Sequence, residues 1–348
     1  MEKVKEENVR VKRNFNLLLF VTFLSGVILI TATYAWFYAS LNVRVNFFNI
    51  KVTDEKGLFI SLDGINFGST VEIDKDYLIN GLSDVYPNNT SQWARFGLFP
   101  VSTVGIKSPM NDRFTMYQIT KTTQILDNIS KRVQVDVGEM TEEGVNNENS
   151  FIAFDIFLKN ASGAPYPDNL YIDEGTSVVY DDTKYNEDAG TINSLRIGFL
   201  RMSSVPHKTP IEEIQSITCN NDCQSVIYEP NHLRHSEKSI ERAEPYGVKL
   251  INGQYNPTYA VYNEGRNLEL ANGQEGSYFD LDNEHFTLQN TRTDFSNSLF
   301  EIPNGITKVR IYIWLEGQDM DGIDTQGDGA FVTVTLNLIK DLAGYRDY

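Results

Sequence analysis

The stretch "KVRIYIWLEG", residues 308–317, alternates between two kinds of side chain. Successive side chains of a β-strand point to opposite faces, so a period of two residues predicts a strand with one buried face. The buried face would carry Val309, Ile311, Ile313 and Leu315. The opposite face, which we expect to meet water, would carry Arg310, Tyr312, Trp314 and Glu316.

Two other stretches repeat this alternation, "FVTVTLNLI" at residues 331–339 and "IAFDIFL" at residues 152–158. Their apolar positions are Val332, Val334, Leu336 and Leu338 in the first and Ile152, Phe154, Ile156 and Leu158 in the second. Such strands are expected to build the core of a sheet protein. We therefore predict that the core includes Ile311, Ile313, Val334 and Leu336.

Shorter alternating runs, separated by turn residues, occur at "FNIKV", "LFISL", "MYQIT", "RVQVDVG" and "LRIGFL". Helical periodicity is limited to "IEEIQSI", from Ile211, and "HLRHSEKSIERA", from His232. Many short strands without a strand–helix rhythm predict a mainly β protein. The expected architecture is an N-terminal transmembrane helix followed by an antiparallel β-sandwich with jelly-roll-like connections and long loop excursions.

Composition divides the chain into five segments. Residues 203–304 are polar, turn-rich and weakly alternating, so we interpret them as a loop-rich insertion or a small lobe. The strong strands after them must return to the main core. The predicted organisation is a basic cytoplasmic end at 1–14, a transmembrane helix or signal segment at 15–38, the first part of an extracellular β-sandwich at 41–202, the insertion at 203–304, and C-terminal strands completing the sandwich at 305–348.

The formal net charge is -17, but basic residues cluster at the N-terminus. These basic residues are Lys3, Lys5, Arg10, Lys12 and Arg13. The rest of the chain is strongly acidic and would repel phosphate backbones. Nucleic acid is therefore not a predicted partner.

Residues 14–43 contain no charged side chain. As a helix rising about 1.5 Å per residue, residues 15–37 would cross the ~30 Å hydrocarbon layer of a membrane. The basic residues before this segment predict a cytoplasmic N-terminus and an extracellular remainder. The predicted location is the cell membrane, with a single pass, and the membrane is the first predicted partner.

The same segment also has features of a cleavable signal. Thr33 and Ala35 form a small-x-small step before Trp36, which suits a signal peptidase. Cleavage near Ala35 would secrete the chain, and a free apolar strand from Trp36 could then add to the sheet of a neighbour. We favour retention because the segment is long enough to span the membrane.

The apolar phase of the chain changes between Phe47 and Phe48. A strand keeps one face buried only while its phase is kept, so we predict a bulge or a change of sheet at this point. In a retained chain, residues 41–47 would form a short edge strand beside the membrane.

The two cysteines, Cys219 and Cys223, lie in "TCNNDC". In an exported chain this spacing predicts a disulfide that closes a tight turn. A zinc site is the alternative, with His232 and His235 as further ligands.

Carboxylates are concentrated in "EGQDMDGIDTQGDG", residues 316–329, between two strong strands. Closely spaced carboxylates with glycines can wrap a calcium ion, which takes oxygen ligands. The EF-hand spacing fails, however, and a solvated hairpin tip is the interpretation that we favour over a calcium loop. The candidate ligands are Glu316, Asp319, Asp321, Asp324 and Asp328. No other cofactor is predicted.

Catalytic motifs of the HExxH, GxSxG, GxGxxG and P-loop types are missing from the sequence. We therefore expect no catalysis. Acceptor sequons are matched at Asn88, Asn89, Asn128 and Asn160, as chance predicts at this asparagine content.

The run "TYAWF", residues 33–37, closes the apolar segment and leads into β-structure. It resembles the T-x-A-x-F signal ends of camelysin-like and biofilm-fibre surface proteins of Gram-positive bacteria. The segments "FDIFLKN", "LYIDEGTSVV", "SLRIGF" and "VRIYIWLEGQD" are similar to parts of uncharacterised, membrane-tethered surface proteins from the same bacteria. The resemblance implies export and a jelly-roll-type domain. Camelysins are described as metallopeptidases, but without HExxH no catalytic residue is carried over.

These observations predict a cell-surface structural or interaction protein, such as an extracellular matrix or biofilm component. Self-association or binding to other surface proteins would be its mode of action. A calcium- or glycan-binding surface module is the alternative. A surface hydrolase is a third hypothesis that rests on the family label alone.

Overall fold

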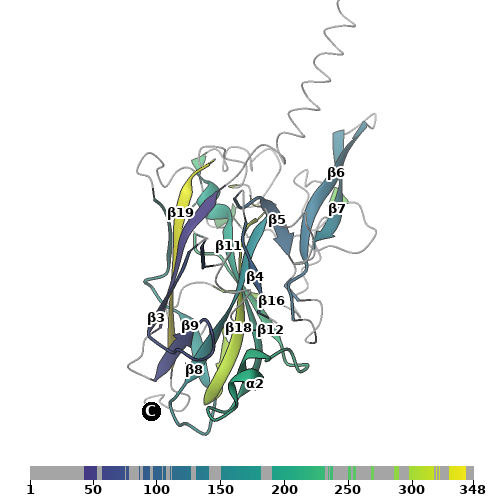
Figure 1. Cartoon of the computed structure of the whole chain (residues 1–348). Coiled ribbons are helices and arrows are strands. Elements are labelled where there is room, and N and C mark those ends of the chain that lie inside the picture. Colours follow the sequence, from purple (N-terminus) through teal and green to yellow (C-terminus); the bar gives the residue numbers. More distant parts are fainter. Residues whose placement is uncertain are drawn as a thin grey trace, which may run out of the picture. The chain divides into compact units, whose positions relative to one another are not determined.

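A computed structural model of the chain is mainly β-structure, as predicted (Figure 1). It describes residues 43–52, 57–74, 76–77, 86, 89–94, 97–103, 105–106, 110, 112–126, 131–140, 150–181, 190–231, 234, 236–237, 250–251, 254–255, 268–269, 286–289, 298–316, 319, 321 and 329–341. Residues 1–40 and 41–348 form two separate units. The predicted membrane segment at 15–38 and the processing residues Ala35 and Trp36 lie outside the described residues. Within the described ranges, no helix is both long and apolar enough to cross a membrane.

Among the described residues, the first sheet has six strands. It includes both β1 (Arg44–Val52) and β19 (Phe331–Asp341), the first and the last strand of the described part of the chain. Its order is β17 (Phe300–Ile302), β9 (Asp168–Ile172), β19, β1 and β3 (Thr70–Asp74), with β10 (Ser177–Tyr180) also paired to β19. We call it the six-stranded sheet.

The second sheet, which has eleven strands among the described residues, is branched around β18. Its main order is β15 (Leu268–Glu269), β7 (Lys131–Met140), β6 (Met116–Leu126), β5 (Pro100–Thr103), β18 (Gly305–Glu316), β11 (Leu195–Val205), β12 (Gln224–Tyr228) and β16 (Phe286–Gln289). The branch is β8 (Phe151–Asn160), which pairs with β18 and with β2 (Leu58–Ser61) and β4 (Ser91–Gln92). We call it the eleven-stranded sheet. A separate small ladder joins β13 (Leu250–Ile251) to β14 (Gln254–Tyr255).

The pairing corrects the prediction of a wholly antiparallel arrangement. Most pairs are antiparallel, but β1 runs parallel to β19, β18 runs parallel to β5, and β12 runs parallel to β16. Parallel neighbours require long connections between the paired strands, so they cannot be recognised from hairpin turns in the sequence. The sheets are therefore mixed.

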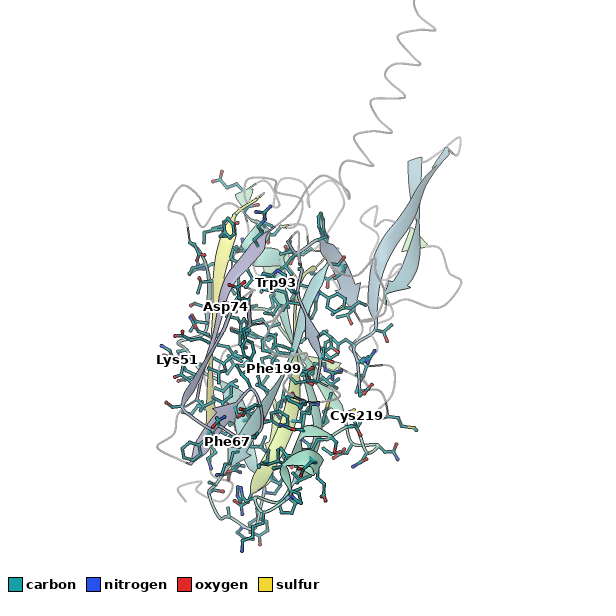
Figure 2. All side chains as sticks on the ribbon, viewed as in Figure 1. Lys51, Phe67, Asp74, Trp93, Phe199 and Cys219 are labelled. Carbon is teal, nitrogen blue, oxygen red and sulfur yellow. A yellow bond between two sulfur atoms is a disulfide. The ribbon has the colours of Figure 1, made fainter. Side chains whose placement is uncertain are left out.

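One hydrophobic core contains side chains from both sheets. Phe48 of β1 meets Phe154 of β8 edge to face, with ring centroids 5.2 Å apart, so the contact joins the two sheets. Figure 1 shows β9 and β19 in one layer and β8, β11 and β18 in the next, and Figure 2 shows the side chains, Phe199 among them, that fill this part of the molecule. The four predicted core residues are confirmed as fully buried: Ile311, Ile313, Val334 and Leu336.

Strand β18 is buried along both faces, which contradicts the prediction that one face meets water. Arg310, Tyr312, Trp314 and Glu316 are all buried. A second hydrophobic core covers this face, and Phe114 stacks on Tyr312 with ring centroids 4.3 Å apart. Its cover comes from distant parts of the chain, including the loop that carries Phe114 and the short helix α2 (Ile211–Gln215), which buries Ile214. A local pattern cannot show that a strand's second face is covered by such distant segments.

Strand β1 has a register shift between Val45 and Phe47 in its pairing with β19. The predicted bulge is confirmed, one residue earlier than the sequence placed it. It brings both Val45 and Phe48 to the buried side. The prediction of a separate edge strand at 41–47 is wrong for the described part, because β1 is continuous and lies between β19 and β3.

Segment 203–304 supplies β12, β15, β16 and β17 to the two main sheets. The predicted helix at Ile211 is present as α2, and a 3-10 helix, η3 (Thr191–Ser194), precedes β11. The helix expected from His232 falls largely outside the described residues, as do His232 and His235 themselves.

Candidate functional site

The carboxylates of the predicted calcium loop follow the end of β18, and three of them are described. Glu316 is fully buried and accepts a hydrogen bond from the indole Nε1–H of Trp314 at 3.2 Å. Asp321 accepts a hydrogen bond from the backbone N–H of Ser236 at 2.8 Å, and its own backbone N–H donates to Asp319 Oδ1 at 2.9 Å. Asp324 and Asp328 lie outside the described residues.

Asp319 belongs to a buried charge cluster centred on Arg196 of β11. Arg196 Nη2 lies 2.5 Å from Asp319 Oδ2 and 3.0 Å from Glu229 Oε1. Its Nη1 donates to the carbonyl oxygens of Asn193 and Leu195. The cluster ties the end of β18 to β11 and to the residue that follows β12.

Burial raises the pKa of Asp319 above its ordinary value; Arg196 opposes this shift and Asp321 adds to it. The described carboxylates of the loop are therefore engaged by donors from the protein itself. No cluster of three or more His, Cys, Asp or Glu side chains with metal-binding geometry occurs in the described part of the chain.

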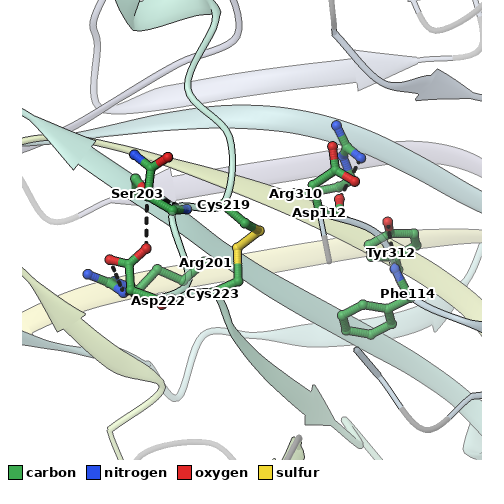
Figure 3. Close-up of a disulfide and its surroundings, with 10 residues drawn as sticks. Asp112, Phe114, Arg201, Ser203, Cys219, Asp222, Cys223, Arg310 and Tyr312 are labelled. Carbon is green, nitrogen blue, oxygen red and sulfur yellow. Dashed lines mark hydrogen bonds and ion pairs between the residues drawn. A yellow bond between two sulfur atoms is a disulfide. The ribbon is translucent and has the colours of Figure 1, made fainter. Parts of the chain in front are cut away.

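Cys219 and Cys223 are joined in a disulfide, with Cα atoms 5.3 Å apart, between α2 and β12 (Figure 3). The turn that it closes is held to β11, because Ser203 Oγ donates to Asp222 Oδ1 at 3.0 Å and Arg201 Nη1 donates to the carbonyl oxygen of Asp222 at 3.1 Å. The sulfur atoms are thus bonded to each other, and Cys223 is buried in the second core.

A second buried charge cluster lies between β8 and β18, on the face that was predicted to meet water. Asp155 forms two hydrogen bonds with Arg310, at 2.7 and 3.3 Å, and lies 3.0 Å from Lys308 Nζ. The backbone N–H of Thr90 also donates to Asp155, at 3.0 Å. Lys308 Nζ lies 5.6 Å from the centroid of the Tyr86 ring.

The directions of the pKa shifts in this cluster indicate which side chain is held in its ionised form. Burial alone would raise the pKa of Asp155, but the charges of Arg310 and Lys308 outweigh it and hold the pKa below its ordinary value. Burial lowers the pKa of Lys308, and the attraction of Asp155 restores it only in part. Asp155 is thus the ionised centre of the cluster.

Three further buried polar residues meet where the two sheets approach each other: Lys340 near the end of β19, Asn160 at the end of β8, and Asp168 at the start of β9. We call them the Lys340 trio. Each has at most 1% of its surface exposed. Lys340 Nζ lies 2.6 Å from Asn160 Oδ1 and 2.8 Å from Asp168 Oδ2.

Both polar atoms of the Asn160 carboxamide form hydrogen bonds. Its Nδ2 donates to Asp168 Oδ2 and to the carbonyl oxygen of Ile302, each at 3.0 Å. Its Oδ1 accepts a second hydrogen bond from the backbone N–H of Ser162, at 3.2 Å. The trio therefore places an amine, a carboxamide and a carboxylate in mutual contact inside the protein.

Sequence reasoning missed the Lys340 trio, although a signal for it was present. Lys340 continues the apolar phase that ends at Leu338, and Asn160 continues the phase that ends at Leu158. Asp168 is likewise in phase with Leu170 and Ile172 of β9, both of which are buried. A polar residue at a core-facing strand position indicates a buried polar contact.

Comparison with known proteins gives no match for this chain: no family model fits it, and neither a curated protein nor a solved structure is significantly similar.

Proposed function

We propose that this protein is a cell-surface structural or interaction protein, with a jelly-roll-like β-sandwich held outside the membrane by a helix at residues 15–38. The uncharged segment and the basic residues before it support the anchor. The Cys219–Cys223 disulfide supports an oxidising location. The resemblance of "TYAWF" to the signal ends of biofilm-fibre proteins supports a matrix role.

The observation that carries the proposal is the parallel pairing of β1 with β19. The ladder runs from Arg44 opposite Phe331 to Val52 opposite Leu338. The end of β1 nearest the proposed anchor and the Asp341 end of β19 therefore lie at opposite ends of the ladder. A pull between these ends loads all the hydrogen bonds of the ladder together, whereas a pull on adjacent ends would break them one by one. This geometry suits a domain that bears force between a membrane and a neighbour.

The described carboxylates of the 316–329 loop do not favour a calcium- or glycan-binding module, because protein donors already occupy them. Asp319 is bound by Arg196, and Asp321 is bound by the backbone of Ser236. Glu316 accepts a hydrogen bond from Trp314, and the other two candidate ligands, Asp324 and Asp328, lie outside the described residues.

The proposal is tested by adding protease to intact cells from which the wall has been stripped. The β-structure after residue 41 should be digested while a cytosolic marker protein survives. A domain that is protected until the cells are lysed would contradict the proposal.

A charge-reversed variant provides the matched control. Substituting Arg10→Glu, Lys12→Glu and Arg13→Glu removes the basic bias without changing the apolar segment. Because flanking basic residues determine orientation, the digested fraction should fall in this variant. An unchanged fraction would contradict the predicted role of these residues.

A further inference from the structure

We propose that Lys340 and Asn160 react within the folded protein to form a covalent amide between the lysine Nζ and the asparagine Cγ, with release of ammonia. The bond would join β19 of the six-stranded sheet to β8 of the eleven-stranded sheet. The proposal concerns a modification site and does not depend on where the protein is located.

The first requirement is that the two reacting groups are held together. Lys340 Nζ lies 2.6 Å from Asn160 Oδ1, and the electrophilic Cγ is bonded directly to that oxygen. Both side chains are buried, and their positions are fixed by the ladders of β19 and β8. Holding two reactants in place converts a very slow bimolecular reaction into a much faster intramolecular one.

The second requirement is a neutral amine, because a protonated lysine has no lone pair with which to attack. Asp168 Oδ2 lies 2.8 Å from Lys340 Nζ and can accept its proton. Transfer of that proton turns a buried ion pair into a neutral amine and a neutral acid.

The third requirement is stabilisation of the negative charge that develops on Asn160 Oδ1 as Nζ attacks. The backbone N–H of Ser162 donates to this oxygen at 3.2 Å. A fixed backbone donor at the oxygen of a carbonyl under attack favours the tetrahedral intermediate.

The fourth requirement is a route for protons to the leaving group. Asp168 Oδ2 contacts Asn160 Nδ2 at 3.0 Å as well as Lys340 Nζ, so one carboxylate oxygen touches both nitrogens. The lysine lone pair forms the Nζ–Cγ bond, and the Cγ–Nδ2 bond breaks with its electron pair leaving on nitrogen. Two protons pass from Nζ through Asp168 to Nδ2, which departs as ammonium. The new amide keeps one N–H, Asp168 ends as a carboxylate, and no oxidant or cofactor is consumed.

Among the residues that the structure describes, Lys308 is a second buried lysine, and it shows why the chemistry is specific to the Lys340 trio. Lys308 also lies 3.0 Å from a carboxylate oxygen, that of Asp155. Arg310 and Lys308 keep Asp155 ionised, however, and an ionised carboxylate is a poor electrophile. Lys308 therefore remains in a salt bridge and serves as an internal control.

The test is mass spectrometry of the full chain, purified, reduced and denatured. We expect a mass lower than that of the sequence by one ammonia. We also expect a proteolytic fragment in which the peptide containing Lys340 is joined to the peptide containing Asn160. An unlinked chain of full mass would overturn the proposal.

Variants assign the ammonia loss to this site, since cyclisation of an Asn-Gly step also releases ammonia. Lys340→Arg should restore the full mass, while Lys308→Met should leave the deficit in place. A deficit that persists in Lys340→Arg, or a loss of water in place of ammonia, would overturn the assignment.

Asp168→Asn tests the proton transfer, because it keeps both reacting groups and removes the shared base. We expect a folded but unlinked chain, with β-structure verified by circular dichroism. A folded Asp168→Asn chain that is fully linked would overturn the role assigned to Asp168. The wild-type mass answers the main question even if the variant fails to fold.

Discussion

At the scale of single residues, the members of a buried charge cluster should contribute unequally to the stability of the fold. Asp155 is in contact with both Lys308 and Arg310, so its charge compensates two buried cations. Removing one partner of a buried ion pair is strongly destabilising because it leaves an uncompensated charge. Replacing Lys308 should be milder, because Arg310 remains paired with Asp155.

We therefore expect Asp155→Asn to lower the free energy of unfolding by about 3–5 kcal/mol. The matched change Lys308→Met should alter it by no more than about 1 kcal/mol, because Arg310 still pairs with Asp155. Urea denaturation of both variants measures the difference. Equal effects of the two substitutions would show that the cluster does not depend on Asp155 in this way.

The pH dependence of stability gives a second view of Asp155. Its pKa in the folded protein is lowered from an ordinary value of 3.8. Its stabilising contribution is therefore complete above that value and is lost as the pH falls through the lower, folded pKa. The difference in unfolding free energy between wild type and Asp155→Asn should shrink below pH 3.8 and stay constant above it. A difference that grows in acid would contradict the direction of the shift.

Gly198 is a residue whose lack of a side chain is required by close packing. A Cβ at this position would lie 2.5 Å from the Phe114 ring and 3.0 Å from the Trp314 ring. Both rings belong to the second core, and overpacking of a core is destabilising. Gly198→Ala should therefore lower the free energy of unfolding by about 1–3 kcal/mol. The matched control is Gly68→Ala, because a Cβ at Gly68 meets only ordinary contacts, and this change should lower the free energy of unfolding by less. Gly163→Ala is not a suitable control, because Gly163 has a positive φ.

At the scale of elements, the two faces of the six-stranded sheet differ. Val334 of β19 is fully buried in the shared core, whereas Val179 of the neighbouring β10 is 48% exposed. The two residues are of the same type and lie on adjacent, paired strands. Burial alone therefore distinguishes them.

Val334→Ala should lower the free energy of unfolding by about 2–4 kcal/mol, through lost burial and a cavity. Val179→Ala should change it by less than about 0.5 kcal/mol, as expected for an exposed site. Thermal and urea denaturation would measure both. Similar losses of unfolding free energy at the two sites would contradict the burial of Val334 in the shared core.

At the scale of the whole molecule, the central prediction concerns the N-terminus. We expect the chain in its native membrane to keep residues 1–35, because residues 15–37 are long enough to span the hydrocarbon layer. Mass spectrometry of the natively expressed protein identifies its N-terminal residue directly. The control Ala35→Leu removes the small residue that a signal peptidase would require, so it should leave the mature N-terminus unchanged. A mature chain beginning at Trp36 would favour secretion and assembly through a free strand.

Strand positions were largely evident from the sequence alone. The period-two runs at residues 152–158, 308–317 and 331–339 correspond to β8, β18 and β19, and their aliphatic positions are in the core. The phase change near Phe47 also revealed the bulge of β1. Such features are local, because alternation and its interruption depend only on which face of one strand is buried.

Only the tertiary structure decided how these strands are paired and what their polar residues do. The parallel pairing of β1 with β19 and the cover over the second face of β18 depend on segments far apart in the chain. The Lys340 trio is the clearest case, since Asn160 and Lys340 are separated by 180 positions and become neighbours only when the two sheets pack together. Alternation shows that each residue faces inward, but the identity of its partner is determined by long-range packing, which no local pattern encodes.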